Sequence, residues 1–417
     1  MPRTQSDTIA DTVRLSIAFL LLGATCAYGA GNPVTLVSDD EAEAIHSAIL
    51  RKEAWTIESV HNLRADAERH LREGPWTITS DRPKDLDLDV HDYYSEASYW
   101  WPDPANPTGP YVRKDGLTNP GRFLANKTAM NAMCEAVLSL GAAAYLLDDP
   151  RYARRAALVI HTWFVNPQTR MNPNLEYSQA IRGSDSGRGA GVLDGRVFIQ
   201  AIQGMEFLSN TGAWDERDQK AVHEWFAEYL NWLIHSRRGG DEKHSGNYHA
   251  SWWTAQVASV ASFLEDTATG QMAFDYYRNT LFPSQIRKDG SAPREEARTK
   301  SVSYSSFNAE AYATICRIAQ VNGVDLWGVH TKDGATLATV IDYLAPVMKE
   351  PARWRKEQIA AYQTDAYAFL AFAAMGLKRP EYIALFRDLE TPSAGAWASL
   401  LDLLVDRWEA SGHQTRH

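Results

Sequence analysis

Three residues in the second half of the chain, His249, Arg298 and Tyr304, have side chains suited to moving a proton beside a carboxylate. A neutral imidazole accepts a proton near pH 7, and a phenol can donate one to a departing oxygen. A guanidinium holds a carboxylate through two parallel hydrogen bonds. Together these groups indicate β-elimination, in which a uronic acid loses its C5 proton and the sugar linked at O4.

His249 is expected at the start of a helix. Apolar residues recur at helical spacing over 249–265, with polar residues between them. The positive end of the helix dipole disfavours an imidazolium in the first turn, which favours a ring able to accept a proton. A histidine that serves packing or lies on the surface is the alternative. Asn247 is a candidate helix cap and a further catalytic candidate.

Tyr304 is expected at the start of the next helix, over 304–322. The helix dipole would favour its phenolate, so Tyr304 could act as the acid or, once ionised, as the base. Arg298 lies six residues upstream and could bind a carboxylate, and Arg294 adds positive charge nearby. A solvated charged loop over 294–300 is the alternative.

Most of the chain is predicted to be helical. Apolar residues recur at three- and four-residue spacing in 40–73, 122–147, 151–165, 196–211, 215–236, 249–265, 268–282, 304–322, 334–349, 361–376, 379–388 and 395–407. We therefore predict an all-α fold over 31–417, a single domain built as a closed or partly closed (α/α) toroid, an incomplete α/α barrel. A helical solenoid is the alternative, although no repeat of fixed length is visible.

Residues 76–120 differ from the rest because they are rich in proline and aromatic residues, and the prolines forbid a long helix. A long irregular segment in a compact domain usually has a function. We expect a lid or wall over a cleft, with Tyr99, Trp100 and Trp101 contacting a sugar. A structural wrap around the toroid is the alternative.

Two other segments give weaker signals. The glycine-rich stretch 177–191 lacks the residue order of a phosphate-binding loop, but its Gln179 and Arg188 could face a cleft. Asn126 and Lys127, at the start of the helix predicted over 122–147, could do the same. For each of these residues a packing role is the alternative to substrate binding.

Composition limits the possible partners. The net charge of −10 argues against nucleic acid or an anionic membrane as the main partner, but it leaves room for an anionic polysaccharide held by basic residues in a cleft. No CxxC or HExxH spacing supports a metal site, and no cofactor is expected. Cys134 and Cys316 lie in apolar helical patterns, so we predict buried free thiols. The oligomeric state is not indicated.

Residues 1–30 have the features of an export signal. Arg3 and Arg14 precede an apolar run that is too short to span a bilayer and is followed by small residues. A first buried helix is the alternative, and Cys26 invites a lipoprotein interpretation that the preceding Thr25 fits poorly. No later segment is expected to be apolar enough to cross a membrane, so the mature protein is expected to be periplasmic or secreted.

Six motifs, taken in order, resemble the alginate lyase superfamily of helical polysaccharide lyases. They are His91 to Pro104 with Asp115-Gly116 and Asn119-Pro120, Tyr177 to Arg196, Asn247-Tyr248-His249, Asp289-Gly290-Ser291 to Arg298-Thr299, Ser303 to Asn308, and Gly323 to Trp327. Each motif alone is weak evidence for the family, so the resemblance rests on the presence of all six in the same order as in the family.

The resemblance implies an (α/α) toroid and β-elimination at C4 and C5 of a uronate. It makes His249 and Tyr304 the proton-transfer pair and Arg298 a carboxylate ligand. One position departs from the family pattern, because the second Asn, which neutralises the carboxylate, is Tyr248 here. Asn247 could take over that role, Tyr248 could donate its hydroxyl, or Arg298 could suffice.

The leading hypothesis is therefore an exported lyase that acts on alginate, polymannuronate or glucuronan. One alternative is a toroidal glycoside hydrolase with two catalytic carboxylates, for which Asp185, Asp194 and Glu296 are the candidates. Another is a glycan-binding protein that lost catalysis together with the Asn at Tyr248.

Overall fold

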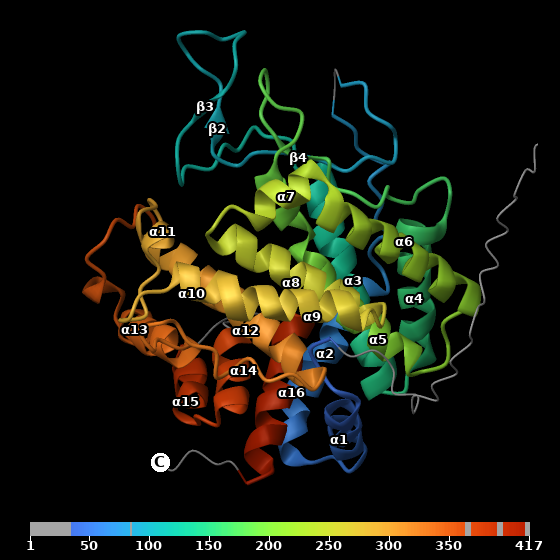
Figure 1. Ribbon diagram of the computed structural model, residues 1–417. Coiled ribbons are helices and arrows are strands. Elements are labelled where there is room, and N and C mark those ends of the chain that lie inside the picture. Colours follow the sequence, from blue (N-terminus) through green and yellow to red (C-terminus); the bar gives the residue numbers. More distant parts are fainter. Residues whose placement is uncertain (1–34, 84–85, 363–367, 390–394, 413–417) are drawn as a thin grey trace, which may run out of the picture. The chain divides into compact units, whose positions relative to one another are not determined.

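The computed structural model describes residues 35–83, 86–362, 368–389 and 395–412, so the expected export signal lies outside the described residues. The described part is mainly helical (Figure 1). Its α-helices are α1 (Asp39–Leu50), α2 (Ile57–His70), α3 (Ala125–Leu146), α4 (Pro150–Ile160), α5 (Phe198–Ser209), α6 (Glu216–His235), α7 (Arg237–Lys243), α8 (Tyr248–Phe263), α9 (Thr267–Tyr276), α10 (Phe282–Gln285), α11 (Pro293–Glu296), α12 (Ser301–Val321), α13 (Leu337–Lys349), α14 (Ala368–Leu377), α15 (Glu381–Asp388) and α16 (Ala396–Ala410). Tighter 3₁₀ turns are η1 (Ala54–Thr56), η3 (Gly189–Val197) and η5 (Pro351–Arg353), and wider π turns are η2 (His161–Val165) and η4 (Tyr277–Leu281).

The inner helices contact one another in a ring. Within the described residues, the order of contacts is α3, α5, α8, α12, α14 and α16, and α16 in turn contacts α3. The outer helices α2, α4, α6, α9, α13 and α15 each pack against one or two members of this ring. The predicted (α/α) toroid is confirmed.

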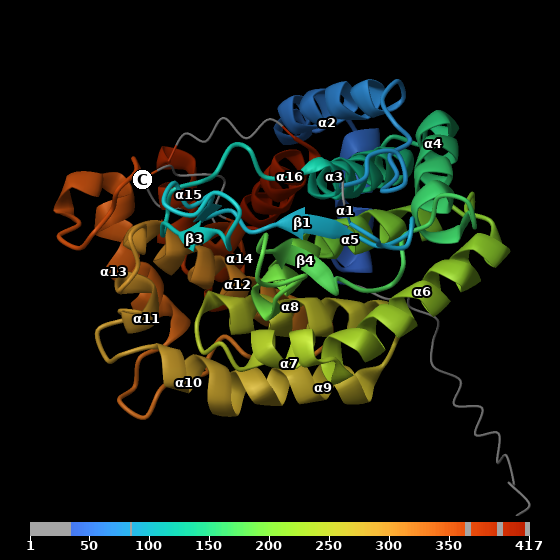
Figure 2. The same cartoon turned by 90° about the horizontal axis from the view of Figure 1, so that it is seen from above.

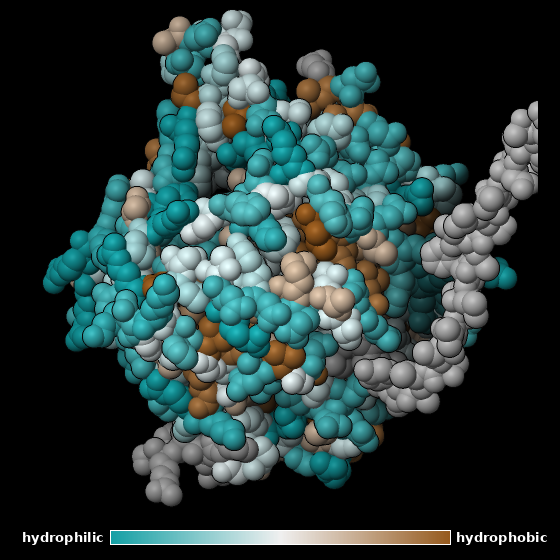
Figure 3. Space-filling model, viewed as in Figure 1, coloured by the Kyte–Doolittle hydropathy of each residue, from teal (hydrophilic) through white to brown (hydrophobic). Residues whose placement is uncertain are grey.

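The two layers of helices differ in how much of their surface they bury. Inner helix α8 buries residues on nearly every side, because it is covered both by neighbours in the ring and by outer helices. Outer helix α6 buries a single stripe at three- and four-residue spacing, running from Val222 to Leu233. Most apolar side chains are therefore enclosed, and the face seen in Figure 3 is mainly hydrophilic with separate hydrophobic patches.

Helix α3 corrects one sequence prediction, because it is long and apolar enough by composition to cross a membrane. In the folded protein, 72% of its apolar window is buried, as in the core helix of a globular domain. Gly141 of α3 lies against Gly204 of α5, where an added Cβ on either residue would overlap the backbone of the other helix. The apolar composition therefore reflects close packing with α5. Cys134 on the same helix is a buried free thiol, as predicted, and so is Cys316.

Four short strands interrupt the helical pattern. Strand β1 (Tyr94–Glu96) pairs in parallel with β4 (Tyr177–Ala180), and β2 (Trp100–Trp101) pairs antiparallel with β3 (Val112–Arg113). Figures 1 and 2 show these strands gathered at one end of the helical ring. The irregular segment 76–120 therefore lies at the same end as the start of α8.

Two differences from the predicted helices have local causes. The segment expected as one helix over 40–73 is divided into α1 and α2 near Lys52, whose φ of 56° is left-handed and ends a helix. Helix α7 was not predicted, because its sequence RRGGDEK contains no apolar residue that could show helical spacing.

Candidate active site

A cavity of about 420 Å³ lies where the irregular segments meet the ends of α8 and α12. Nine of the twelve predicted site residues line it: Tyr99, Trp100, Gln179, Arg188, Asn247, Tyr248, His249, Arg298 and Tyr304. They come from segments far apart in sequence, so the fold brings them together. We call this the His–Tyr cavity.

The start of α8 is fixed by three side chains. The Asn247 side-chain oxygen accepts the His249 backbone N–H at 3.2 Å, as predicted for an N-cap. Glu295 accepts the Tyr248 N–H at 2.7 Å, and Gln285 donates to the Asn247 carbonyl at 3.1 Å. Burial raises the pKa of Glu295 to about 7. These contacts hold the His249 backbone in place and leave the Nδ2 amide of Asn247 without a hydrogen-bond partner among the described residues.

His249 is oriented by a carboxylate that the sequence did not reveal. Its Nδ1 lies 2.7 Å from Oε1 of Glu242, a residue of α7 that is buried. When Nδ1–H donates to this carboxylate, Nε2 is left as the proton acceptor. Burial raises the pKa of Glu242, and the adjacent His249 opposes that rise. Glu242 is therefore placed to fix both the tautomer and the orientation of the imidazole.

Tyr248 connects the two predicted proton-transfer residues. Its ring stacks on His249 with centroids 4.4 Å apart and on Tyr304 with centroids 5.3 Å apart. The guanidinium of Arg298 lies 4.3 Å from the centre of the Tyr304 ring. His249 and Tyr304 therefore both stack on Tyr248, and all three side chains line the His–Tyr cavity.

The environment of Tyr304 corrects the expectation of a favoured phenolate. Burial raises its pKa well above the ordinary value, and so does the hydrogen bond to the Tyr99 hydroxyl at 2.7 Å. The opposing effect of Arg298 is smaller. Desolvation therefore outweighs the helix dipole, and Tyr304 holds its proton. In this state it is suited to the role of acid.

Arg298 is held by a carboxylate from the irregular segment. Its Nε and Nη2 donate to the two oxygens of Asp115 at 3.1 and 2.9 Å, and the Thr299 hydroxyl donates to the same group. Burial opposes ionisation of Asp115, but the hydrogen bonds from Arg298 and Arg113 hold its pKa well below the usual range. At Gly116, where φ is +73°, a Cβ would overlap Thr299, so glycine allows this close contact. Segment 76–120 is thereby fastened beside α12.

The lining of the His–Tyr cavity is strongly basic although the whole chain is acidic. Besides Arg298, it contains Arg113, Lys127, Arg188 and Arg196, and none of its described lining residues is Asp or Glu. Such a concentration of positive charge attracts a polyanion. The condition under which an acidic chain could take an anionic polysaccharide, basic residues gathered in a cleft, is therefore met.

Three predicted substrate-binding residues do not line this cavity. Trp101 follows Trp100 on β2, and successive side chains of a strand point to opposite faces, so its indole donates to the Leu117 carbonyl at 2.9 Å instead. Asn126 is buried and bonds to backbone groups of Tyr94, Ile78 and Asp81. Arg294 is exposed and donates to the Ser245 carbonyl at 2.8 Å. In this structure all three side chains bond to backbone groups of the protein.

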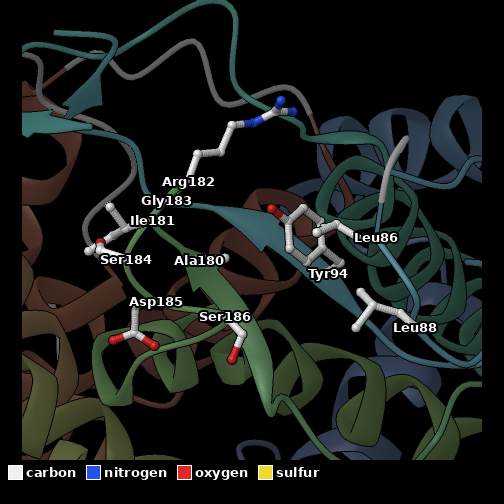
Figure 4. A pocket seen from close by; sticks show the side chains of 10 residues that line it. All are labelled: Leu86, Leu88, Tyr94, Ala180, Ile181, Arg182, Gly183, Ser184, Asp185 and Ser186. Carbon is white, nitrogen blue, oxygen red and sulfur yellow. The ribbon is translucent and has the colours of Figure 1, made fainter. Parts of the chain in front are cut away.

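The carboxylates required by the hydrolase alternative are dispersed. Asp194 is buried and accepts hydrogen bonds from Lys127, Tyr93 and Ser95. Glu296 is paired with Lys356. Asp185 lines a separate cavity of about 440 Å³, shown in Figure 4, which contains none of the predicted catalytic residues. These positions provide no pair of carboxylates facing the His–Tyr cavity.

Some functional candidates escaped sequence reasoning. Glu242 lies on the helix that was not predicted, and Asp115 was noted only as part of a motif. Arg196 marked only the end of a motif, but it lines the cavity. Lys127 was noted together with Asn126, and of these two residues only Lys127 lines the cavity.

Comparisons with known proteins show the family and the fold. A family model described as Alginate lyase matches residues 77–354. The fold is similar to the crystal structure of an alginate lyase from Bacteroides ovatus, with 27% identity and a TM-score of 0.83, covering 89% of this chain and 99% of that one. It is also similar in fold to a His-to-Ala variant of alginate lyase A1-III complexed with tetrasaccharide, with 14% identity, a TM-score of 0.56 and coverage of 86% and 92%. A search among curated proteins found no match.

Proposed function

The chain belongs to the alginate lyase family, and from this premise we propose that it cleaves a 4-linked polyuronate by β-elimination in the His–Tyr cavity. The observation that carries the proposal is the stacking of His249 and Tyr304 on one ring inside a basic cavity. The arrangement supports the proposal because a candidate proton acceptor, a candidate proton donor and several cations line one cavity. The products would carry 4,5-unsaturated uronate ends.

The substrate carboxylate is expected to bind beside Asn247 and Tyr248. The Nδ2 amide of Asn247 is the donor left over after capping α8. The Tyr248 hydroxyl is the other available donor, since burial raises its pKa and keeps it protonated, although Arg298 beside it opposes that rise. Arg298 is already engaged by Asp115, so it contributes mainly positive charge. Withdrawing charge from the carboxylate makes the C5 proton easier to remove.

His249 and Tyr304 carry out the two proton transfers. Nε2 of His249 removes the C5 proton, the electron pair forms the C4–C5 double bond, and the C4–O4 bond breaks. Tyr304 donates its proton to O4, which leaves as the new reducing end of the neighbouring chain. D-mannuronate and D-glucuronate both place the C5 proton and O4 on one face of the ring. A single tyrosine that performs both transfers is therefore the second assignment.

The direct test is to incubate the purified protein with polymannuronate, glucuronan and other polyuronates and to follow ultraviolet absorbance. New absorbance from unsaturated ends is the expected result. Saturated reducing ends would instead select hydrolysis. Binding without any product, followed by turnover in Tyr248→Asn, would select the glycan-binding alternative.

Replacing Glu242 by Gln should lower kcat by about 10- to 100-fold with little change in KM, because a charged hydrogen-bond partner no longer stabilises the imidazolium formed during proton removal. Gln keeps the size and an acceptor for Nδ1. Steady-state kinetics on polymannuronate measure the effect. Glu242→Asp, which keeps the charge, should recover part of the loss. A rise in KM at constant kcat would contradict the positioning role.

Replacing Tyr248 by Phe should lower kcat/KM by about 10- to 100-fold, because it removes a hydroxyl donor to the substrate carboxylate and leaves the stacked ring in place. Initial rates at low substrate concentration measure this effect. Full activity in Tyr248→Phe would show that the ring is only a spacer, and it would assign carboxylate binding to Asn247 and Arg298.

The localisation also stays a proposal. The features of residues 1–30 favour export to the periplasm or secretion, which would give the enzyme access to large polysaccharides. Fractionation of cells that express the full chain tests this. A protein retained in the cytoplasm with an intact N-terminus would contradict it.

A further inference from the structure

Arg196 links the His–Tyr cavity to a second cavity of about 710 Å³. The two cavities adjoin, because they share Tyr99, Arg196, Tyr304 and Phe307. The second cavity adds the aromatic side chains of Trp252 and Trp397. Aromatic rings offer flat apolar surfaces on which a sugar ring can lie. The second cavity therefore has the lining of a sugar subsite next to the cleavage site.

The guanidinium of Arg196 stands out by its lack of a partner. In the part of the chain that the structure describes, it makes no ion pair or hydrogen bond, and it lies 5.4 Å from the centre of the Phe307 ring. The other arginines of the His–Tyr cavity are engaged: Arg298 and Arg113 bond to Asp115, and Arg188 bonds to Gln179.

The carboxylate of Asp194 does not satisfy Arg196. Asp194 favours the charged guanidinium through space, but its oxygens already accept hydrogen bonds from Lys127, Ser95 and Tyr93. Arg196 is half-buried, and burial lowers the pKa of its guanidinium. A half-buried guanidinium without a partner can form charge-assisted hydrogen bonds with an anion brought by a ligand.

We propose that Arg196 binds the carboxylate of the uronate adjoining the cleaved one, and thereby selects polymers with two consecutive uronates. The proposal rests on the proposed lyase function. A guanidinium matches a carboxylate through two parallel hydrogen bonds, and this match gives specificity for charge and for orientation. Lys300, which also lines the second cavity, lies 5.8 Å from the Tyr99 ring and provides charge without such a fork.

The test is a double-mutant cycle, which compares a change in the protein, a change in the ligand and both changes together. Binding of tetramannuronate to the Tyr304→Phe protein is measured by calorimetry at fixed ionic strength, together with four synthetic tetrasaccharides that each carry mannose in place of one mannuronate. Mannose should weaken binding by about 10- to 100-fold at the position whose carboxylate meets Arg196, because a hydrogen bond to a charged group is lost there. Adding Arg196→Gln should weaken tetramannuronate binding by a similar factor and abolish the effect of mannose at that position only.

The fold-losses in affinity caused by Arg196→Gln and by mannose could instead multiply at every position, as independent effects do. That result would overturn the role of Arg196 and leave the lyase function intact. The same coupling in Lys300→Gln would also overturn it, because a general field would then explain the data. If the wild-type protein cleaves a different polyuronate, the cycle uses the tetrasaccharide of that polymer; if it cleaves none, the lyase function itself is refuted. Should Arg196→Gln not fold, Arg196→Lys keeps the charge and removes the fork. It should weaken binding by a smaller factor, again with coupling at one position.

Discussion

Replacing Tyr304 by Phe is expected to lower kcat on polymannuronate by at least about 1,000-fold, because it removes the acid that protonates the leaving O4. Burial and Tyr99 raise the pKa of Tyr304, so its proton is present when the glycosidic bond breaks. The Phe ring keeps the stacking with Tyr248 and the contact with Arg298. KM should therefore change little.

A matched control is Tyr99→Phe, which removes the hydroxyl that is hydrogen-bonded to Tyr304 and leaves the proposed acid itself. Its kcat should fall by about 10-fold or less, the range of one neutral hydrogen bond. Thermal unfolding should be similar in both variants, because each loses the same hydrogen bond. If Tyr304→Phe kept more than a tenth of the wild-type kcat, another group would have to be the acid.

Replacing His249 by Ala is expected to lower kcat by about 1,000-fold, because it removes the base that accepts the C5 proton. This variant also leaves the buried Glu242 carboxylate without its partner, which is destabilising. His249→Gln avoids this second effect, because its amide can still donate to Glu242 but cannot take up a proton. Both variants should be equally slow if the lost function is proton transfer.

Rescue by added imidazole separates chemistry from structure. The alanine variant leaves space in the cavity, and a free imidazole there can accept the C5 proton. Activity of His249→Ala should therefore rise with imidazole concentration, whereas His249→Gln, whose side chain fills the space, should not respond. Substantial activity in His249→Gln without imidazole would transfer the role of base to Tyr304, as in the single-tyrosine assignment.

The sequence was most informative where a signal is local along the chain. Helical spacing located α8 and α12, and the N-cap at Asn247 placed His249 in the first turn, because capping and amphipathic spacing depend only on near neighbours. The toroid and most residues of the His–Tyr cavity followed from the same patterns and from the order of the motifs.

The sequence was least informative about partners that meet across the fold. Nothing in the stretch RRGGDEK indicated a helix, or that its Glu242 would lie against His249 at the start of α8. The bond between Asp115 and Arg298 joins residues more than 180 positions apart. Asn126 and Lys127 were both candidates for the cleft, but only Lys127 lines the cavity, because the side chain of Asn126 binds backbone groups.

The chain by itself therefore determined the helical ring, the residue types available for proton transfer and the departure at Tyr248. Only the tertiary structure decided which ionisable groups are buried, and with which partners. Helix position predicted a phenolate at Tyr304, but desolvation reversed that expectation. A pKa and a hydrogen-bond partner depend on everything within a few ångströms, and most of those atoms belong to residues distant in sequence.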